Sequence, residues 1–169
     1  DTLVNPALLD LAPRGAERIA RSRDRFPSQA EVNACLVEHA RAGRVVVRLK
    51  GGDPYVFGRG GEEAEGLAAA KIAFEVVPGV SSVTAVPSYA GIPLTHRGHS
   101  SSFTVLTGHE DPDKEGGQLD WDQLARVPGT KVILMGAERI AAVAEALRGR
   151  GVPDETPVAV VQSGTTGRQ

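Results

Sequence analysis

Short β-branched runs that end in glycine- or proline-containing loops, each followed by a helical segment, recur along this chain of 169 residues. The two clearest runs are 44–49, which leads into the loop 50–54 (KGGDP), and 74–77, which leads into the loop 78–82 (PGVSS). Strands and helices in turn predict an α/β fold with mainly parallel sheet. Ligands of an open α/β sheet bind where the strands end, so these two loops are expected to carry function.

Similar patterns predict the remaining elements. Ser28 and Glu31 have the spacing of a capping box, which starts a helix over 28–42 that Gly43 ends. Asn5-Pro6 is typical of a helix start. Further helices are predicted at 62–70, 82–89, 121–126 and 138–148, and further strands at 17–19, 103–107, 131–135 and 158–161. The arginine-containing stretch 20–26 is predicted to be an exposed loop.

The division into domains follows from the stretch 91–101, where Pro93, Gly98 and a polar run separate two strand-helix blocks. This pattern predicts an N-terminal lobe over 1–97 and a C-terminal lobe over 98–169. Hydrophobic residues make up 41% of the chain, enough for a core, but no apolar run approaches the roughly 20 residues of a membrane span. We therefore expect a soluble protein without a membrane segment.

Charge and cysteine content exclude several classes of partner. A net charge of -2 gives no general attraction to nucleic acid. The single cysteine, Cys35, cannot form an intramolecular disulfide, which favours the reducing cytoplasm. The four histidines form no HExxH motif and no CxxC occurs, so we expect no metal site. The phosphate-loop and dinucleotide glycine motifs are also missing, which argues against a nucleoside triphosphatase or an NAD enzyme.

The loop 50–54 leaves two interpretations open. Its glycines let backbone N–H groups approach a ligand, and Asp53 could accept hydrogen bonds from a hydroxyl or an ammonium group. Alternatively, the loop is a glycine turn with an aspartate cap and no ligand. In the second loop, Ser81 and Ser82 could bind the same ligand, or could serve as ordinary caps of the following helix.

The segment 49–63 (LKGGDPYVFGRGGEE) resembles the signature block of the uroporphyrinogen-III C-methyltransferases, in the tetrapyrrole methylase family, almost residue for residue. Supporting matches lie at 77–82 (VPGVSS), 91–97 (GIPLTHR), 107–109 (TGH), 135–136 (MG) and 157–166. The resemblance implies a two-lobed α/β fold, with mostly parallel sheet in the N-terminal lobe and mixed sheet in the C-terminal lobe. It also implies a homodimer that binds S-adenosylmethionine in the cleft between its lobes.

The resemblance also implies roles for individual residues. The positions that match family contacts to S-adenosylmethionine are Gly51, Gly52, Asp53, Val56, Ser81, Ser82, Met135 and Gly164. Asp1 matches an aspartate that accepts a proton, and Arg23 is nearest to the family's proton-donating lysine, although a guanidinium keeps its proton at neutral pH. Since uroporphyrinogen III is a polycarboxylate, we expect Arg59 and Arg97 to bind it, with an ion pair to Glu62 or Glu63 as the alternative for Arg59.

The implied reaction is the transfer of two methyl groups from S-adenosylmethionine to uroporphyrinogen III, which gives precorrin-2 for siroheme or cobalamin and S-adenosylhomocysteine as the other product. The family's first strand, with its G-x-G-x-G-D loop, is not in this sequence, and neither are its last strands, so we expect a partial chain. Three alternatives stay open: a methyltransferase for a later precorrin, an inactive module that only binds S-adenosylmethionine, and a general nucleotide-binding domain.

Overall fold

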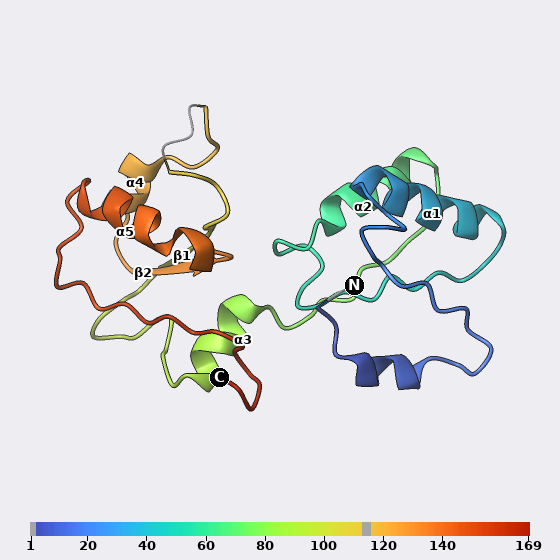
Figure 1. Cartoon of the computed structure of the whole chain (residues 1–169), viewed down its shortest axis with the longest axis horizontal. Helices are drawn as coiled ribbons and strands as arrows, with labels where there is room; N and C mark the ends of the chain where they lie inside the picture. The colour runs from blue at the N-terminus through green and yellow to red at the C-terminus, as the bar shows by residue number, and fades with distance from the viewer. Residues whose placement is uncertain (1–2, 113–115) are drawn as a thin grey trace. The chain divides into compact units, whose positions relative to one another are not determined.

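The computed structural model describes residues 3–112 and 116–169, and the chain divides into two compact units, Asp1–Ser81 and Ser82–Gln169 (Figure 1). Contacts group α3 (Ser82–Tyr89) with the second unit, whereas the predicted lobes 1–97 and 98–169 place it in the first. The predicted lobe boundary stays a prediction. Within the described residues, no helix is long and apolar enough to cross a membrane.

The first unit contains the 3-10 helix η1 (Pro6–Leu11) and the helices α1 (Gln29–Arg41) and α2 (Gly60–Ala69). Both predicted starts are confirmed. The Asn5 side chain caps η1 by accepting the N–H of Ala7 at 3.1 Å. The capping box of α1 is complete, because the Ser28 hydroxyl accepts the Glu31 N–H while the Glu31 carboxylate accepts the Ser28 N–H at 2.8 Å.

The helices α1 and α2 pack against each other, as Figure 1 shows. Gly66 makes the close approach possible, because a Cβ at this position would lie 3.2 Å from the Asn33 side-chain nitrogen. The same nitrogen donates to the Glu62 carbonyl at 2.9 Å. Phe26 and Val32 are the buried apolar residues of this unit. The contact between the two helices is therefore partly polar, and the charged side chain of Glu63 is buried in the same unit.

The strands predicted at 17–19, 44–49 and 74–77 are not formed in the first unit. Their β-branched composition is that of strands, and Val45 is 95% exposed. A run of this kind becomes a strand only when a neighbour supplies the ladder of hydrogen bonds, and the sheet in the described part of the chain joins β1 and β2 alone. The segments instead run as irregular chain into the loops that follow them.

The second unit has a strand-helix-strand layout. The strands β1 (Phe103–Thr107) and β2 (Thr130–Leu134) pair in parallel, from Phe103 opposite Thr130 to Thr107 opposite Leu134. The helices are α3, α4 (Trp121–Arg126), the 3-10 turn η2 (Ala137–Arg139) and α5 (Ile140–Arg148). The α/β class and the parallel pairing predicted from the sequence are confirmed, whereas the predicted strand at 158–161 is not formed.

A small apolar core joins the sheet of this unit to its helices. It consists of Leu106 from β1, Trp121 from α4, and Val143 and Ala146 from α5. Each of these residues is less than a tenth exposed. Asp120 starts α4 by accepting the Gln123 N–H at 2.9 Å, so the short helix presents Trp121 to the core from its first turn. The core fixes where the loops after β1 and β2 emerge.

Candidate functional site

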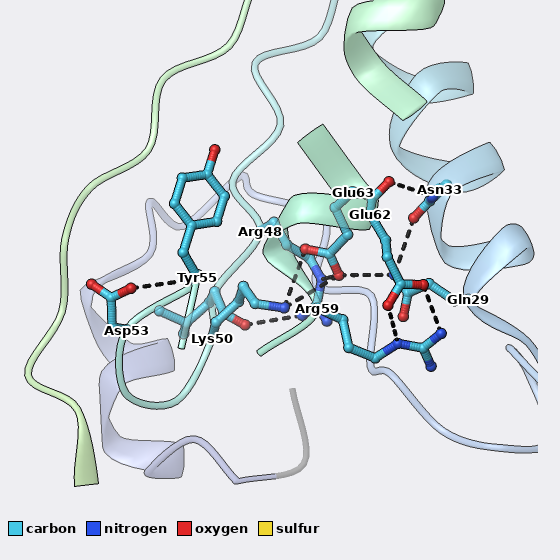
Figure 2. A network of polar contacts seen from close by, with 10 residues as sticks. Gln29, Asn33, Arg48, Lys50, Asp53, Tyr55, Arg59, Glu62 and Glu63 are labelled. Atoms are coloured by element: carbon cyan, nitrogen blue, oxygen red, sulfur yellow. Dashed lines mark hydrogen bonds and ion pairs between the residues drawn. The ribbon is translucent and has the colours of Figure 1, made fainter. Parts of the chain in front are cut away.

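The two glycine loops predicted to carry function lie side by side in the first unit. We call residues 50–60 and 78–81 the paired loops. The Asp53 carboxylate connects them, because Oδ1 accepts the N–H of Tyr55 at 2.9 Å and Oδ2 accepts the N–H of Gly79 at 3.1 Å. Figure 2 shows the first of these hydrogen bonds. Asp53 thus closes a turn in its own loop and also holds the second loop in place.

Glycines allow the paired loops to touch through their backbones. A Cβ at Gly79 would overlap the carbonyl oxygen of Gly52, so only glycine fits there. Gly52 itself has a φ of 67°, a left-handed conformation that glycine adopts without strain, and its Cβ position is 3.8 Å from the Ser81 Cα. The expected convergence of Gly52, Asp53 and Ser81 on one place is therefore observed within this unit.

The first loop also folds onto itself before α2 begins. The N–H of Val56 donates to the Asp53 carbonyl at 3.2 Å, and the N–H of Gly60 donates to the Pro54 carbonyl at 3.0 Å. The Tyr55 and Val56 side chains remain exposed. The loop therefore offers an apolar surface beside the Asp53 carboxylate, a combination that suits a ligand with an apolar and a cationic part.

Behind the first loop lies a buried carboxylate, that of Glu63 in the first turn of α2. Its oxygens accept hydrogen bonds from Lys50 Nζ at 3.2 and 3.3 Å, from Arg48 Nε at 3.1 Å and from Gln29 Nε2 at 3.2 Å (Figure 2). Lys50 and Glu63 are almost fully buried, and Arg48 is partly so. Sequence reasoning missed this network, since the Gly-Gly-Glu-Glu start of α2 does not reveal which glutamate turns inward.

Arg59 is not a free cation in the structure. Its Nε and Nη2 each donate to a Glu62 carboxylate oxygen at 2.8 Å, in an exposed two-pronged ion pair. These hydrogen bonds raise the pKa of Arg59 and lower the pKa of the Glu62 carboxyl below its ordinary value. Arg59 is also the N-cap residue of α2, with a φ of 58° and no side-chain capping hydrogen bond. The alternative predicted for this residue, an ion pair with Glu62, is thus observed.

In the second unit, the loops after β1 and β2 meet at the carboxyl ends of the two strands. A Cβ at Gly108 would lie 2.5 Å from the Gly136 Cα, and the N–H of Gly108 donates to the Leu134 carbonyl at 2.7 Å. Met135, which directly follows β2, has a φ of 58° and is 57% exposed. This conformation is unusual for a bulky residue and makes the exposed Met135 a candidate for a functional role.

Gly164 lies elsewhere in the same unit, packed on α3. A Cβ at this glycine would lie 2.5 Å from Cγ2 of Val86, so the turn that contains Gly164 fits closely over the helix. The neighbours Ser163 and Thr165 both have positive φ, at 53° and 67°. This geometry explains why the position is glycine, whether or not it contacts a ligand.

The other predicted site residues are placed as follows. Arg23 and Arg97 are exposed, and neither forms an ion pair with another described residue. Ser82 is the first residue of α3. Asp1 lies outside the described residues. Within those residues, no group of three histidine, cysteine, aspartate or glutamate side chains could hold a metal ion. The role of each predicted residue toward a ligand stays a prediction.

Residues 1–169 match the protein family described as Tetrapyrrole (Corrin/Porphyrin) Methylases. The chain is 54% identical over 172 residues to the S-adenosyl-L-methionine-dependent uroporphyrinogen III methyltransferase of Methanosarcina barkeri, which covers 100% of this chain and 68% of that protein. It is 47% identical to the siroheme synthase of Edwardsiella ictaluri, over 100% of this chain and 37% of that protein.

A solved structure resembles this one as well. The uroporphyrin-III C-methyl transferase from Thermus thermophilus, complexed with S-adenyl homocysteine, superimposes with a TM-score of 0.61 and 47% identity, over 73% of this chain and 52% of that chain. The chain thus spans about two thirds of the Methanosarcina protein's length, about half of the Thermus chain and about a third of the siroheme synthase.

Proposed function

The chain belongs to the tetrapyrrole methylase family, and on that premise we propose that it catalyses, within the whole protein, the methylation of uroporphyrinogen III by S-adenosylmethionine. Two transfers give precorrin-2, the precursor of siroheme and cobalamin. The observation that carries the proposal is the pair of glycine loops joined by Asp53, which combines close backbone approach with a single carboxylate. The names of the relatives support the same substrate and methyl donor.

The paired loops suit S-adenosylmethionine chemically. The donor carries a cationic sulfonium and an ammonium group, both attracted by a carboxylate. Each Asp53 carboxylate oxygen accepts one hydrogen bond, from the N–H of Tyr55 or from that of Gly79. A carboxylate can accept about four hydrogen bonds. The Asp53 carboxylate can therefore still accept hydrogen bonds from S-adenosylmethionine. Gly51 and Gly52 let the backbone approach a ligand closely, and the exposed Val56 offers apolar contact.

The remaining predicted contacts to the methyl donor are Ser81, Ser82, Met135 and Gly164. The exposed thioether of Met135 gives this assignment its best support, because the strained backbone there has no role in the apolar core. Polarizable sulfur makes favourable contacts with aromatic rings such as adenine.

The chemistry requires positioning more than activation. The sulfonium methyl group is already electrophilic, so the protein mainly holds a nucleophilic pyrrole carbon in line with it and excludes water. Methylation of that carbon places positive charge on the tetrapyrrole, and loss of a proton restores neutrality. We assign Asp1 as the base that accepts this proton. Arg23 stands nearest to the family's proton-donating lysine, although a guanidinium keeps its proton at neutral pH.

Arg59 and Arg97 bind the carboxylates of the tetrapyrrole in this proposal. Arg97 is exposed and forms no ion pair within the described part of the chain, so it is available to a substrate. Arg59 must exchange the Glu62 carboxylate for a substrate carboxylate, an exchange that costs little because exposed ion pairs are worth about 0–1 kcal/mol. A homodimer belongs to the proposal through the family alone, and a cytoplasmic location through the single cysteine.

The proposal is tested by calorimetric titration of the chain with S-adenosylhomocysteine, the stable product of methyl transfer. Asp53→Ala is measured beside it, with Asp10→Ala as a matched control, because Asp10 is an exposed aspartate in η1. Saturable binding that is lost in the Asp53 variant and kept in the Asp10 variant supports the donor site. Absence of binding by the unsubstituted chain contradicts a donor site formed by these residues alone.

Binding of the product without transfer would instead favour an inactive binding module. A second assay separates the two functions, by following methyl transfer from S-adenosylmethionine to uroporphyrinogen III. Use of a later precorrin in preference to uroporphyrinogen III would assign the chain to another branch of the family.

A further inference from the structure

We propose that Glu63 is a positioning residue for the methyl-donor site: its buried carboxylate holds Lys50 and thereby fixes the start of the paired loops. The inference rests on the proposed function, since the loops matter only if they bind the donor. Glu63 does not itself lie at the loop surface. It is 5% exposed, and it reaches the loops through the side chain of Lys50.

The network around Glu63 connects three segments that are distant in the sequence. Glu63 stands in the first turn of α2, Gln29 in the first turn of α1, and Arg48 and Lys50 in the segment that leads into the first loop. Figure 2 shows their side chains converging on the Glu63 carboxylate. Four hydrogen bonds to this carboxylate connect all three segments.

Lys50 transmits the restraint because it directly precedes Gly51. Its ammonium group is bound by both Glu63 oxygens, and its side chain is 5% exposed, so it cannot itself contact a ligand in solvent. Its Cε lies 3.3 Å from the position of a Cβ on Gly58, which places the lysine stem beneath the far side of the same loop. Both ends of the loop that contains Asp53 therefore depend on the place of Lys50.

Charge makes Glu63 hard to replace. One buried carboxylate faces two cations, and removing its charge leaves Lys50 and Arg48 without a buried partner. A buried charge without a partner is strongly unfavourable, so Lys50 is expected to turn toward water. The backbone at Gly51 and Gly52 then moves with it, and the carboxylate of Asp53 loses its fixed position.

The experiment compares Glu63→Gln with Glu65→Gln. Glu65 lies in the same helix, but it is exposed and takes no part in the network. Two quantities are measured for each variant and for the unsubstituted chain: the Kd of S-adenosylhomocysteine by calorimetry, and amide hydrogen exchange of the ligand-free chain by mass spectrometry. We expect a Kd raised about tenfold in Glu63→Gln and unchanged in Glu65→Gln. Exchange should rise in 50–57 and 78–81, and not in β1.

Each outcome decides between the two proposals. If the unsubstituted chain binds S-adenosylhomocysteine and the two glutamine variants bind it equally well, the positioning role is wrong while the proposed function stands. If the unsubstituted chain does not bind, the donor site is not complete within these residues, and exchange in the ligand-free state then decides the role of Glu63. Faster exchange throughout the chain, rather than in the paired loops, would show general destabilisation and overturn the inference.

A second variant keeps the test decisive if Glu63→Gln does not fold. Lys50→Gln removes the other partner and leaves Glu63 paired with Arg48, so no buried charge is left alone. We expect the same local rise in exchange over 50–57 and a weaker affinity for S-adenosylhomocysteine. Unchanged exchange and affinity in Lys50→Gln would overturn the route through Lys50.

Discussion

The backbone N–H of Gly79 donates to Oδ2 of Asp53 at 3.1 Å and so connects two loops that are distant in the sequence. The contact requires glycine on one side and a carboxylate on the other. Because the same Asp53 also binds the N–H of Tyr55, one side chain sets the shape of both loops. Asp53 thus has a role in the fold, and experiment can separate this role from its proposed contact to the methyl donor.

Gly79→Ala is expected to destabilise the chain by about 1–3 kcal/mol, because the new methyl group would overlap the Gly52 carbonyl oxygen and force the loops apart. Gly61→Ala is the control, since a Cβ there meets no atom within 4 Å and Gly61 lies in α2. The control should be neutral or stabilising by about 0.5–1 kcal/mol. The free energy of unfolding in urea measures both. Equal stability of the two variants would contradict the close contact.

Asp53→Asn separates the charge of Asp53 from its size. Its amide oxygen can still accept the Tyr55 N–H, but the amide nitrogen cannot accept the Gly79 N–H. We expect a loss of about 1 kcal/mol in the free energy of unfolding, with Asp10→Asn unchanged. If the carboxylate also attracts the methyl donor, the binding free energy of S-adenosylhomocysteine should weaken by more than this change in the free energy of unfolding. Wild-type affinity in Asp53→Asn would remove the carboxylate from the donor site.

The pKa of the Glu62 carboxyl should rise toward its ordinary value in Arg59→Gln. Two hydrogen bonds from Arg59 favour the charged form of Glu62, so its folded pKa lies below the unfolded one. The stability that the pair contributes is therefore present above the unfolded pKa and is lost as pH falls through the folded pKa. Carboxyl NMR titration of both chains measures the shift.

Asp154 provides the control for that titration. Its pKa is lowered by Arg148 in the same manner, in another unit of the chain, and it should titrate identically with and without the Arg59 substitution. A parallel shift of both carboxyls would point to a general change in the protein rather than to the loss of one pair.

Elements with local signals could be predicted from the sequence, and elements that depend on distant partners could not. The helices α3 and α4 and the strand β1 have the predicted bounds, and the capping box of α1 forms as expected. The segment 44–49 has the composition of a strand, yet no ladder forms there, because composition does not supply the neighbouring strand.

The candidate site likewise contains features that have local sequence signals and features that depend on distant partners. The positions of the two glycine loops could be predicted, because each follows a β-branched run, whereas the role of Asp53 toward a ligand stays a prediction. The inward turn of Glu63 could not be predicted, since Glu62 and Glu63 are adjacent and identical in type. Only the packing of α2 on α1 determines which of the two is buried.

Met135 offers a test of function against fold. Its φ of 58° is unfavourable for any residue with a Cβ, by about 1 kcal/mol, so Met135→Gly should keep or raise the free energy of unfolding. Lys71→Gly is the matched control, because Lys71 has the same φ of 58° and no assigned role. If the thioether contacts the methyl donor, Met135→Gly alone should weaken S-adenosylhomocysteine binding, by about tenfold for a buried apolar contact. Strain retained at the cost of stability would then be explained by binding, whereas equal affinity in both variants would leave Met135 without a role at the donor site.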